Sequence, residues 1–263
     1  MRYTLDSDGG HMFVPLSEGS FLVDTGSPTS FSRTGTLSFR GQAETVARNA
    51  LGMLDADKLS GYVGVNVDGL IGMDLLSRHL IVFNGNEMLV DECPVPDSDF
   101  SDAGDESFMG IPVISFQIDG RTVKMFVDTG AKVSYLDAAL MESFLVEETV
   151  RDFYPGFGQF NVDVSTASGE IAGYLFTARF GRLPALLQMT LMMGACRGSL
   201  AAICSNNSVS GWQEGELPPP SLGGRGSDDF VRNMPNGRRM PRSTIPATAS
   251  GRQNGENHRK ETT

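Results

Sequence analysis

The chain has 263 residues, 40% of them hydrophobic, which suffices for one large domain or two smaller lobes with apolar cores. Its formal net charge is −11, which argues against sequence-independent binding of nucleic acid through the folded body, because such binding needs a basic face. The same charge disfavours docking on an anionic membrane surface. We therefore expect no nucleic acid and no membrane among the partners of this chain.

The cysteines and the amino terminus indicate an intracellular setting. Three cysteines are present, Cys93, Cys196 and Cys204, and their spacing matches neither a disulfide framework nor a zinc motif. Residues 1–6 lack the apolar core of a signal peptide, and no apolar run approaches the length of a membrane span. We expect a cytoplasmic protein with reduced thiols and with no bound metal or cofactor.

Short apolar runs and one helical pattern make up the first part of the chain. Residues 12–14 and 21–23 are expected to be strands joined by a hairpin across residues 17–20, and residues 31–39 to form a small hairpin around Thr34-Gly35. An amphipathic helix that ends at Gly61 is then expected from the spacing of its apolar positions, which are Ala43, Val46, Ala47, Ala50, Leu51 and Leu54.

A second informative stretch spans residues 68–83. It places two apolar residues directly before a glycine, in Leu70-Ile71-Gly72, and it then predicts a short helix and a hairpin whose turn is Asn84-Gly85-Asn86. His79 lies at the end of the short helix. We interpret it as a surface residue rather than a catalytic one.

An acidic stretch separates this region from a second one with a similar plan. Residues 93–107 are rich in Asp and contain no basic residue, which predicts a solvated linker. Residues 111–118 and 122–127 are expected to pair across a turn at Asp119-Gly120. Asp137 is expected to cap a helix whose apolar residues are Leu140, Met141, Phe144 and Leu145.

The rest of the second region predicts one more hairpin and a counterpart of the apolar-apolar-Gly motif. Residues 160–164 and 171–176 flank a polar segment that we interpret as a hairpin tip. Leu191-Met192-Met193-Gly194 is interpreted as the counterpart of Leu70-Ile71-Gly72. From residue 205 onward, repeated Gly, Ser and Pro with few aliphatic residues predict a disordered tail.

One short pattern occurs twice, and the rest of the chain is arranged around it. An apolar run leads into Asp24-Thr25-Gly26, and a similar run leads into Asp128-Thr129-Gly130. A buried strand with this ending can deliver a carboxylate to the bottom of a cleft, where glycine permits a sharp turn and close approach of a substrate. Two such loops facing each other would share one proton, so that one carboxyl acts as acid and the other as base. The alternative is two unrelated tight turns at strand ends.

With these motifs in view, the chain resembles aspartic proteases of the retropepsin and pepsin type. In that family each lobe runs apolar strands, Asp-Thr-Gly followed by Ser or Ala, further strands, two apolar residues with Gly, and a short helix. Here Asp24-Thr25-Gly26-Ser27 and Leu70-Ile71-Gly72 carry the resemblance in the first lobe, and residues 111–120 with Asp128-Thr129-Gly130-Ala131 carry it in the second. It covers residues 11–204 and is similar to two retropepsin-sized lobes fused in one chain.

The resemblance implies a mainly β, two-lobe aspartic-protease fold, with β-barrel-like lobes and a few short helices. The implied division is an amino-terminal lobe at residues 1–92, the acidic linker at 93–107, a carboxy-terminal lobe at 108–204 and the disordered tail at 205–263. Because both half-sites lie on one chain, the resemblance also implies a monomer.

The resemblance assigns catalysis to the two aspartates. Asp24 and Asp128 would activate a water that attacks a peptide bond of a polypeptide substrate, with no covalent intermediate, no metal and no cofactor. Thr25 and Thr129 would brace the two loops against each other. The implied activity is that of an aspartic endopeptidase, a hydrolase.

The neighbouring residues of the loops receive supporting roles. Gly26 and Gly130 would line the cleft with backbone. Ser27 would hydrogen-bond the outer oxygen of Asp24, whereas Ala131 cannot do the same for Asp128. This difference would make the two carboxyls unequal.

Two other functions and one structural question remain open on the sequence alone. A peptide-binding module could keep the cleft without cleaving, although a carboxylate pair is costly to bury and binding does not need it. A structural or interaction protein would leave the repeated motif unexplained. As the flap over the cleft, the hairpin of residues 160–176 is a better candidate than the short one at residues 31–39.

Overall fold

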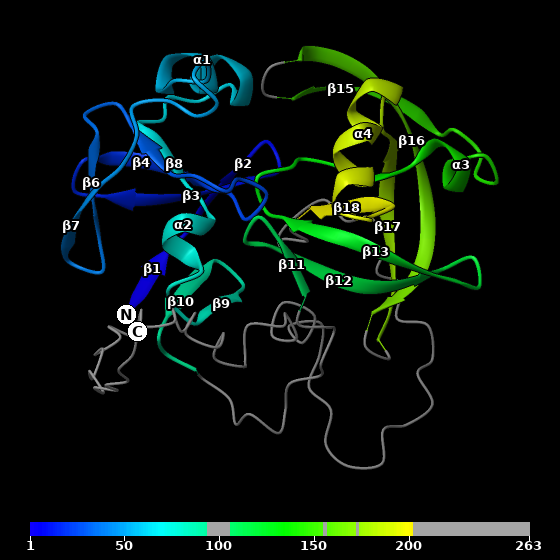
Figure 1. Ribbon diagram of the computed structural model, residues 1–263, viewed down its shortest axis with the longest axis horizontal. Helices are drawn as coiled ribbons and strands as arrows, with labels where there is room; N and C mark the ends of the chain where they lie inside the picture. Colours follow the sequence, from blue (N-terminus) through cyan, green and yellow to red (C-terminus); the bar gives the residue numbers. More distant parts are fainter. Residues whose placement is uncertain (94–105, 155–156, 172–173, 202–263) are drawn as a thin grey trace, which may run out of the picture.

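The computed structural model describes residues 1–93, 106–154, 157–171 and 174–201, and it is mainly β with a few short helices, as predicted. We call residues 1–93 the first half and residues 106–201 the second half. Figure 1 shows them side by side, the first in blue and cyan and the second in green and yellow. The elements of the first half are β1 (Arg2–Thr4), β2 (Asp6–Asp8), β3 (His11–Leu16), β4 (Gly19–Val23), β5 (Phe31–Ser32), β6 (Thr36–Phe39), β7 (Gln42–Thr45), α1 (Ala56–Val63), β8 (Gly69–Ile71), α2 (Met73–Leu76), β9 (Ile81–Asn84) and β10 (Glu87–Val90).

The second half holds longer strands. Its elements are β11 (Glu106–Phe108), β12 (Ile111–Ile118), β13 (Arg121–Asp128), β14 (Ser134–Leu136), α3 (Ala138–Met141), β15 (Glu148–Tyr154), β16 (Gly158–Ile171), β17 (Tyr174–Arg182), α4 (Ala185–Met193) and β18 (Gly198–Ala201). The predicted tail at 205–263 and most of the predicted linker at 93–107 lie outside the described residues. The last linker residues, Glu106 and Ser107, belong to β11, which pairs with β12.

Both halves contain the same four-strand arrangement. In the first half the hairpin β3–β4 lies next to β8, which runs parallel to β4, and β5 follows on the far side of β8. In the second half the hairpin β12–β13, the parallel strand β18 and β14 stand in the same order. The register agrees as well: Phe21, three residues before Asp24, pairs with Gly69, and Met125, three residues before Asp128, pairs with Gly198. The repeated motif therefore sits on a repeated structural unit.

The two halves surround this unit differently. In the second half, pairing between β12 and β16 closes the strands β12, β13, β18, β14, β17 and β16 into a ring. Along β12, Ile114, Phe116 and Ile118 are buried and alternate with exposed Ser115 and Gln117, as expected for a strand with one face on the core. In the first half the strands form three separate sheets, and α1 and the hairpin β6–β7 are added to them.

The predicted hairpins at β3–β4, β9–β10 and β12–β13 are confirmed. The turn of the small hairpin was predicted at Thr34-Gly35, and this position is wrong. The hairpin is formed by β6 and β7, which pair across Arg40-Gly41. Both turn residues have positive φ, 56° and 73°, a conformation that a two-residue hairpin turn requires.

The helices are short, and the first is not where the apolar period predicts it. Residues 42–45 form β7, and Ala47 and Leu51 are exposed, so the helical spacing of residues 43–54 does not mark one buried face. The helix instead begins after Asp55, whose side chain accepts a hydrogen bond from the Lys58 amide, and ends at Gly64, beyond the predicted Gly61. None of the helices in the described ranges is long and apolar enough to cross a membrane.

In the second half, Asp137 caps α3 as predicted, by accepting from the Leu140 amide. The helix ends earlier than expected, at Met141, and Leu145 is exposed. The expected hairpin tip between residues 164 and 171 is wrong, because these residues lie inside the single strand β16 and pair with β17.

The proposed counterpart of Leu70-Ile71-Gly72 is also wrong. Met192 and Met193 end helix α4, and Gly194 follows it against the Phe126 ring. The strand that takes the place of β8 is β18, so the counterpart is Ser199-Leu200-Ala201. A close backbone approach is common to β8 and β18. A Cβ added to Gly69 would lie 2.1 Å from a carbonyl oxygen of β5, and one added to Gly198 would lie 2.3 Å from a carbonyl oxygen of β14.

Candidate active site

The two Asp-Thr-Gly loops meet between the halves. Asp24 follows β4 and Asp128 ends β13, and each carboxyl affects the pKa of the other. As whole residues, both aspartates are half-buried, whereas the threonines that follow them are buried. The structure thus brings together the two carboxylates that the repeated motif predicts would be neighbours.

Each glycine of the motif lies against the opposite carboxyl. A Cβ added to Gly26 would stand 2.4 Å from Cγ of Asp128, and one added to Gly130 would stand 2.3 Å from Cγ of Asp24. Neither contact leaves room for a side chain. Glycine is required at both positions because the loops approach this closely, and not because of a left-handed φ.

The two threonines brace the loops through a reciprocal set of hydrogen bonds. The Thr25 amide donates to Thr129 Oγ1 at 3.0 Å, and the Thr129 amide donates to Thr25 Oγ1 at 3.0 Å. Each hydroxyl then donates across to the other half, Thr25 Oγ1 to the Val127 carbonyl at 2.7 Å and Thr129 Oγ1 to the Val23 carbonyl at 2.9 Å. All four bonds are buried, so they fix the position of one aspartate relative to the other.

The expected difference between Ser27 and Ala131 takes another form. Ser27 Oγ donates to the Thr29 carbonyl at 2.9 Å, so the predicted hydrogen bond from this hydroxyl to Asp24 is wrong. Asp24 accepts from the Gly26 amide at 2.8 Å. The Ala131 amide donates to Oδ1 of Asp128 at 3.1 Å, so this residue contributes through its backbone.

Two serines that the sequence interpretation missed hold the loops to the central strands. The Gly72 amide donates to Ser30 Oγ at 2.9 Å, and the Ala201 amide donates to Ser134 Oγ at 3.0 Å. Ser30 Oγ in turn donates to Asp74 of α2. A signal for both was present, since each serine lies six residues after its aspartate, in the shared pattern Asp-Thr-Gly-x-x-x-Ser.

Burial makes both carboxyls of the pair hold protons more firmly than usual. Burial, together with the neighbouring Asp128 carboxylate, raises the pKa of Asp24 well above its ordinary value of 3.8. Burial also raises the pKa of Asp128, to about 6, against the opposing effect of the Ala131 and Gly130 amides. Such a pair carries one shared proton over a range that extends toward neutral pH.

This shift predicts a pH-dependent difference in stability between the wild type and Asp128→Asn. With a pKa of about 6 in the folded chain and 3.8 as the ordinary value, the folded chain keeps a proton that the unfolded chain has lost. The stability from this group is fully present below about pH 4 and is lost as the pH rises through about 6. The free energy of unfolding of the variant should therefore exceed that of the wild type by about 3 kcal/mol near pH 7 and match it near pH 3, measured by urea unfolding. An equal difference at both pH values would contradict the raised pKa.

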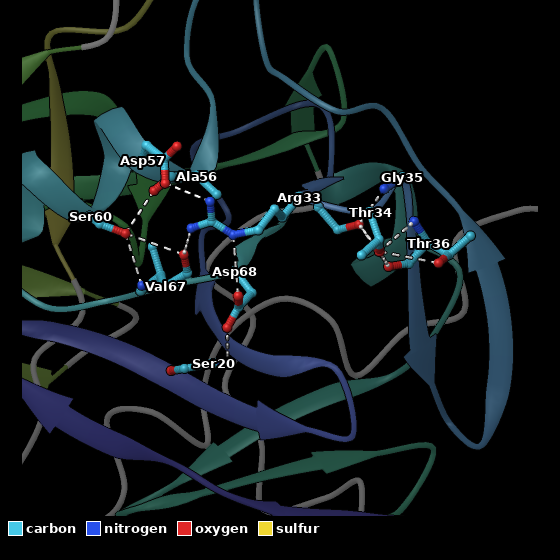
Figure 2. A network of polar contacts seen from close by, with 11 residues as sticks. Ser20, Arg33, Thr34, Gly35, Thr36, Ala56, Asp57, Ser60, Val67 and Asp68 are labelled. Atoms are coloured by element: carbon cyan, nitrogen blue, oxygen red, sulfur yellow. Dashed lines mark hydrogen bonds and ion pairs between the residues drawn. The ribbon is translucent and has the colours of Figure 1, made fainter.

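An arginine network anchors α1 to the central strand of the first half. Figure 2 shows Arg33 between α1 and the residues that precede β8. Its guanidinium donates to Asp57 Oδ1 at 2.5 Å and to the Val67 carbonyl at 3.4 Å, and it lies 3.5 Å from Asp68 Oδ1. Asp68 also accepts from the Ser20 amide at 3.2 Å, which connects the network to β4 and so to the strand that carries Asp24.

The second half has the same ion pair with its charges exchanged. The Arg33 amide donates to the Asp68 carbonyl at 2.8 Å, and the Asp137 amide donates to the Arg197 carbonyl at 2.8 Å. The side chains of Asp137 and Arg197 form an ion pair as those of Arg33 and Asp68 do. If β8 and β18 were exchanged between the halves, Asp68 would face Asp137. The exchanged charges therefore favour the docking of each central strand in its own half.

Strand β15 lies close to the second Asp-Thr-Gly loop, through Phe153 and His11. Phe153 stacks on Tyr62 of α1 with ring centroids 4.7 Å apart, and it lies 6.3 Å from His11. At the other end of the β16–β17 hairpin, Glu170 pairs with Gln117, next to the turn that is farthest along β12–β13 from Asp128. The end of this hairpin at Gly169 and Glu170 therefore pairs with β12 far from Asp128, which does not favour it as a flap over the site.

Two of the three cysteines lie within the described residues. Burial raises the pKa of the Cys196 thiol to about 11, Cys93 is exposed, and Cys204 lies outside the described residues. In the described part of the chain, no group of three or more His, Cys, Asp or Glu side chains is placed to hold a metal ion.

No protein-family model matches the chain, and no curated protein matches it. Among solved structures, it is similar to the solution structure of the simian foamy virus (mac) protease, at 18% identity over 34% of this chain and 87% of that one, with a TM-score of 0.27. It is also similar to the foamy viral protease-reverse transcriptase in complex with an RNA/DNA hybrid, at 11% identity over 35% of this chain and 11% of that one, with a TM-score of 0.28. The interpretation of the site rests on its own geometry.

Proposed function

We propose that the protein is an aspartic endopeptidase that hydrolyses peptide bonds with Asp24 and Asp128. The observation that carries the proposal is the carboxyl pair itself: two aspartates on repeated loops, each lying against the glycine of the opposite loop, with the loops locked together by buried threonine hydrogen bonds. Burying two carboxyls side by side is costly, and a purely structural contact does not need it. A fixed pair that shares one proton is suited to acid–base catalysis.

The proposed reaction uses a water held between the two carboxyls. The ionised carboxyl removes a proton from this water as its oxygen attacks the peptide carbonyl carbon, and the protonated carboxyl donates its proton to the carbonyl oxygen. The tetrahedral intermediate then collapses as a proton passes to the leaving nitrogen and the C–N bond breaks. The carboxyls exchange roles during the cycle, and no covalent bond to the protein forms.

The proposed substrate is an extended polypeptide, and the proposed active form is a monomer. Gly26 and Gly130 leave backbone beside the carboxyls, which lets a peptide approach the pair closely. Thr25 and Thr129 join both half-sites within one chain. A second chain is not needed to complete the pair.

The experiment is cleavage of an unfolded protein substrate between pH 4 and pH 7, with and without a statine-type transition-state analogue. We expect cleavage that the analogue blocks, and a rate that falls in proportion when the enzyme is diluted. Binding of the analogue without cleavage would instead favour a peptide-binding module with a retained cleft. The absence of both cleavage and analogue binding would overturn the proposal. A rate that falls faster than the enzyme concentration would show that the active form is not a monomer.

A further inference from the structure

A third carboxyl is buried on β15, one residue before Phe153, whose ring lies 6.3 Å from that of His11. His11 in turn contacts the Gly130 carbonyl of the second Asp-Thr-Gly loop. Asp152 on β15 is 8% exposed, and both of its oxygens are occupied. Oδ2 accepts from the Tyr135 hydroxyl, and Oδ1 accepts from the Phe153 amide at 2.8 Å. With its acceptors taken up in this way, Asp152 is placed to act on its neighbours rather than to contact a substrate directly.

The neighbour on which it acts is Asp128. The Asp152 carboxylate contributes to the raised pKa of Asp128, after burial, and both carboxylates contribute to the raised pKa of the Tyr135 phenol. Like charges at short range make it harder for the second group to ionise. The Asp152 carboxylate therefore raises the pKa of Asp128, whereas the amide hydrogen bonds of Gly130 and Ala131 lower it.

The first half has no hydroxyl at the corresponding place. Tyr135 lies seven residues after Asp128, and the residue seven after Asp24 is Phe31, which is fully buried. Their backbones have the same role, since Phe31 pairs with β8 and Tyr135 with β18. Tyr135 and Asp152 are thus present in only one of the two repeated units, that of the second half. They make the two aspartates unequal, which the Ser27 hydroxyl does not.

The remaining titratable groups near this cluster come from β3 and from the loop after Gly130. His11 of β3 is buried, and its Nδ1 lies 2.9 Å from the Gly130 carbonyl oxygen, to which it donates as the Nδ1–H tautomer. Burial lowers the pKa of His11, with Asp152 and Asp8 acting to raise it and Lys132 acting to lower it. Among the described residues, the charged groups that act on Asp128, Tyr135 or His11 include Asp24, Asp152, Asp8 and Lys132.

We propose that Asp152, held in place by Tyr135, is a positioning residue that acts through Asp128 and makes the dyad retain its shared proton at higher pH. The inference rests on the proposed function, because the shared proton matters only if the pair performs acid–base chemistry. The physical cause is the negative charge of the Asp152 carboxylate, which the Tyr135 hydroxyl and the Phe153 amide hold in position. The expected consequence is an active range that extends further toward neutral pH than burial of the dyad alone would give.

The test is Asp152→Asn, which keeps the size of the side chain and its partners. The Asn oxygen accepts from the Phe153 amide, and its amide group donates to the Tyr135 oxygen. With the charge gone, the dyad loses its shared proton at lower pH, so the alkaline limb of the kcat/KM profile should move down by roughly 0.5 to 1 pH unit, with kcat on the plateau largely kept. Asp163→Asn, which removes an exposed carboxylate from the adjacent strand β16, is the matched control and should leave the profile in place.

Further measurements separate this inference from the proposed function and from a structural role. Carbon-13 NMR of labelled aspartate carboxyls follows the titration of the dyad without substrate, and the same downward shift is expected there even if no peptide is cleaved. Tyr135→Phe installs the first half's residue and should shift the titration in the same direction by less, because the Asp152 carboxylate remains but loses the hydroxyl that holds it in place. A folded Asp152→Asn with an unmoved titration would overturn the proposal, as would a uniform loss of rate at all pH values. If Asp152→Asn did not fold, an unmoved titration in Tyr135→Phe would overturn it.

Discussion

Replacing Asp128 by Asn will abolish cleavage of a polypeptide substrate while the chain stays folded. Asn has the size of Asp, but it can neither take a proton from a water nor share one with Asp24. Loss of a positioned acid or base costs roughly 10²- to 10⁴-fold in rate. The measurement is the initial rate of cleavage at the pH where the wild type is most active, with circular dichroism to verify the fold.

Two companion variants make this result interpretable. Asp24→Asn removes the other member of the pair and should lose activity to a similar extent, because the two carboxyls work as a unit. Asp163→Asn removes an exposed carboxyl of the second half and should cleave at the wild-type rate. A dyad variant that cleaved as fast as the wild type would show that the reaction does not depend on this pair.

The repeated motif was the part of the molecule most accessible from sequence. An apolar run that ends in Asp-Thr-Gly specifies a strand, a sharp loop and a close approach, and these are local requirements. The same holds for Asn84-Gly85-Asn86 and Asp119-Gly120, whose composition fixes a hairpin turn without reference to the rest of the chain. The sequence therefore predicted where these strands end and which residues form the loops and turns that follow them.

The errors arose where a pattern has two physical explanations. The helical spacing of residues 43–54 coincides with a β-strand and a loop, because pairing of β7 with β6 decides the conformation there. Leu191-Met192-Met193-Gly194 has the composition of the expected motif, yet its last residues end a helix, and the strand that completes the unit is Ser199-Leu200-Ala201. That strand is recognisable through its glycine, Gly198, which must pass close to a neighbouring carbonyl oxygen. Long-range pairing of this kind leaves little trace in local sequence.

The asymmetry of the pair was also beyond the sequence, because it is a tertiary property. The residues that follow the two loops differ most visibly at Ser27 and Ala131, but the Ser27 hydroxyl is bound to Thr29. The Asp152 carboxylate, which accepts a hydrogen bond from Tyr135, adds to the raised pKa of Asp128 and lies more than twenty residues later in the chain. A duplicated unit can thus acquire unequal carboxyls through a strand that lies outside the duplicated part.

Replacing Thr129 by Val will destabilise the fold and disable the site together. Val has the shape of Thr without its hydroxyl, so the variant leaves the Val23 carbonyl and the Thr25 amide without their partners in a buried position. Each unsatisfied buried group costs about 1–3 kcal/mol, so we expect a loss of about 2–4 kcal/mol in the free energy of unfolding, measured by urea denaturation. Cleavage should fall as well, because the carboxyls are no longer held at a fixed separation.

The matched variants test whether the hydroxyls cause this loss. Thr25→Val breaks the reciprocal bonds, to the Val127 carbonyl and from the Thr129 amide, and should cost a similar amount. Thr129→Ser restores the hydroxyl and lacks the methyl group, so it should recover most of both stability and activity. If Thr129→Ser were as unstable as Thr129→Val, packing of the methyl group would matter as much as the hydroxyl. If both Val variants were as stable as the wild type, the hydrogen bonds could not be what holds the two aspartates together.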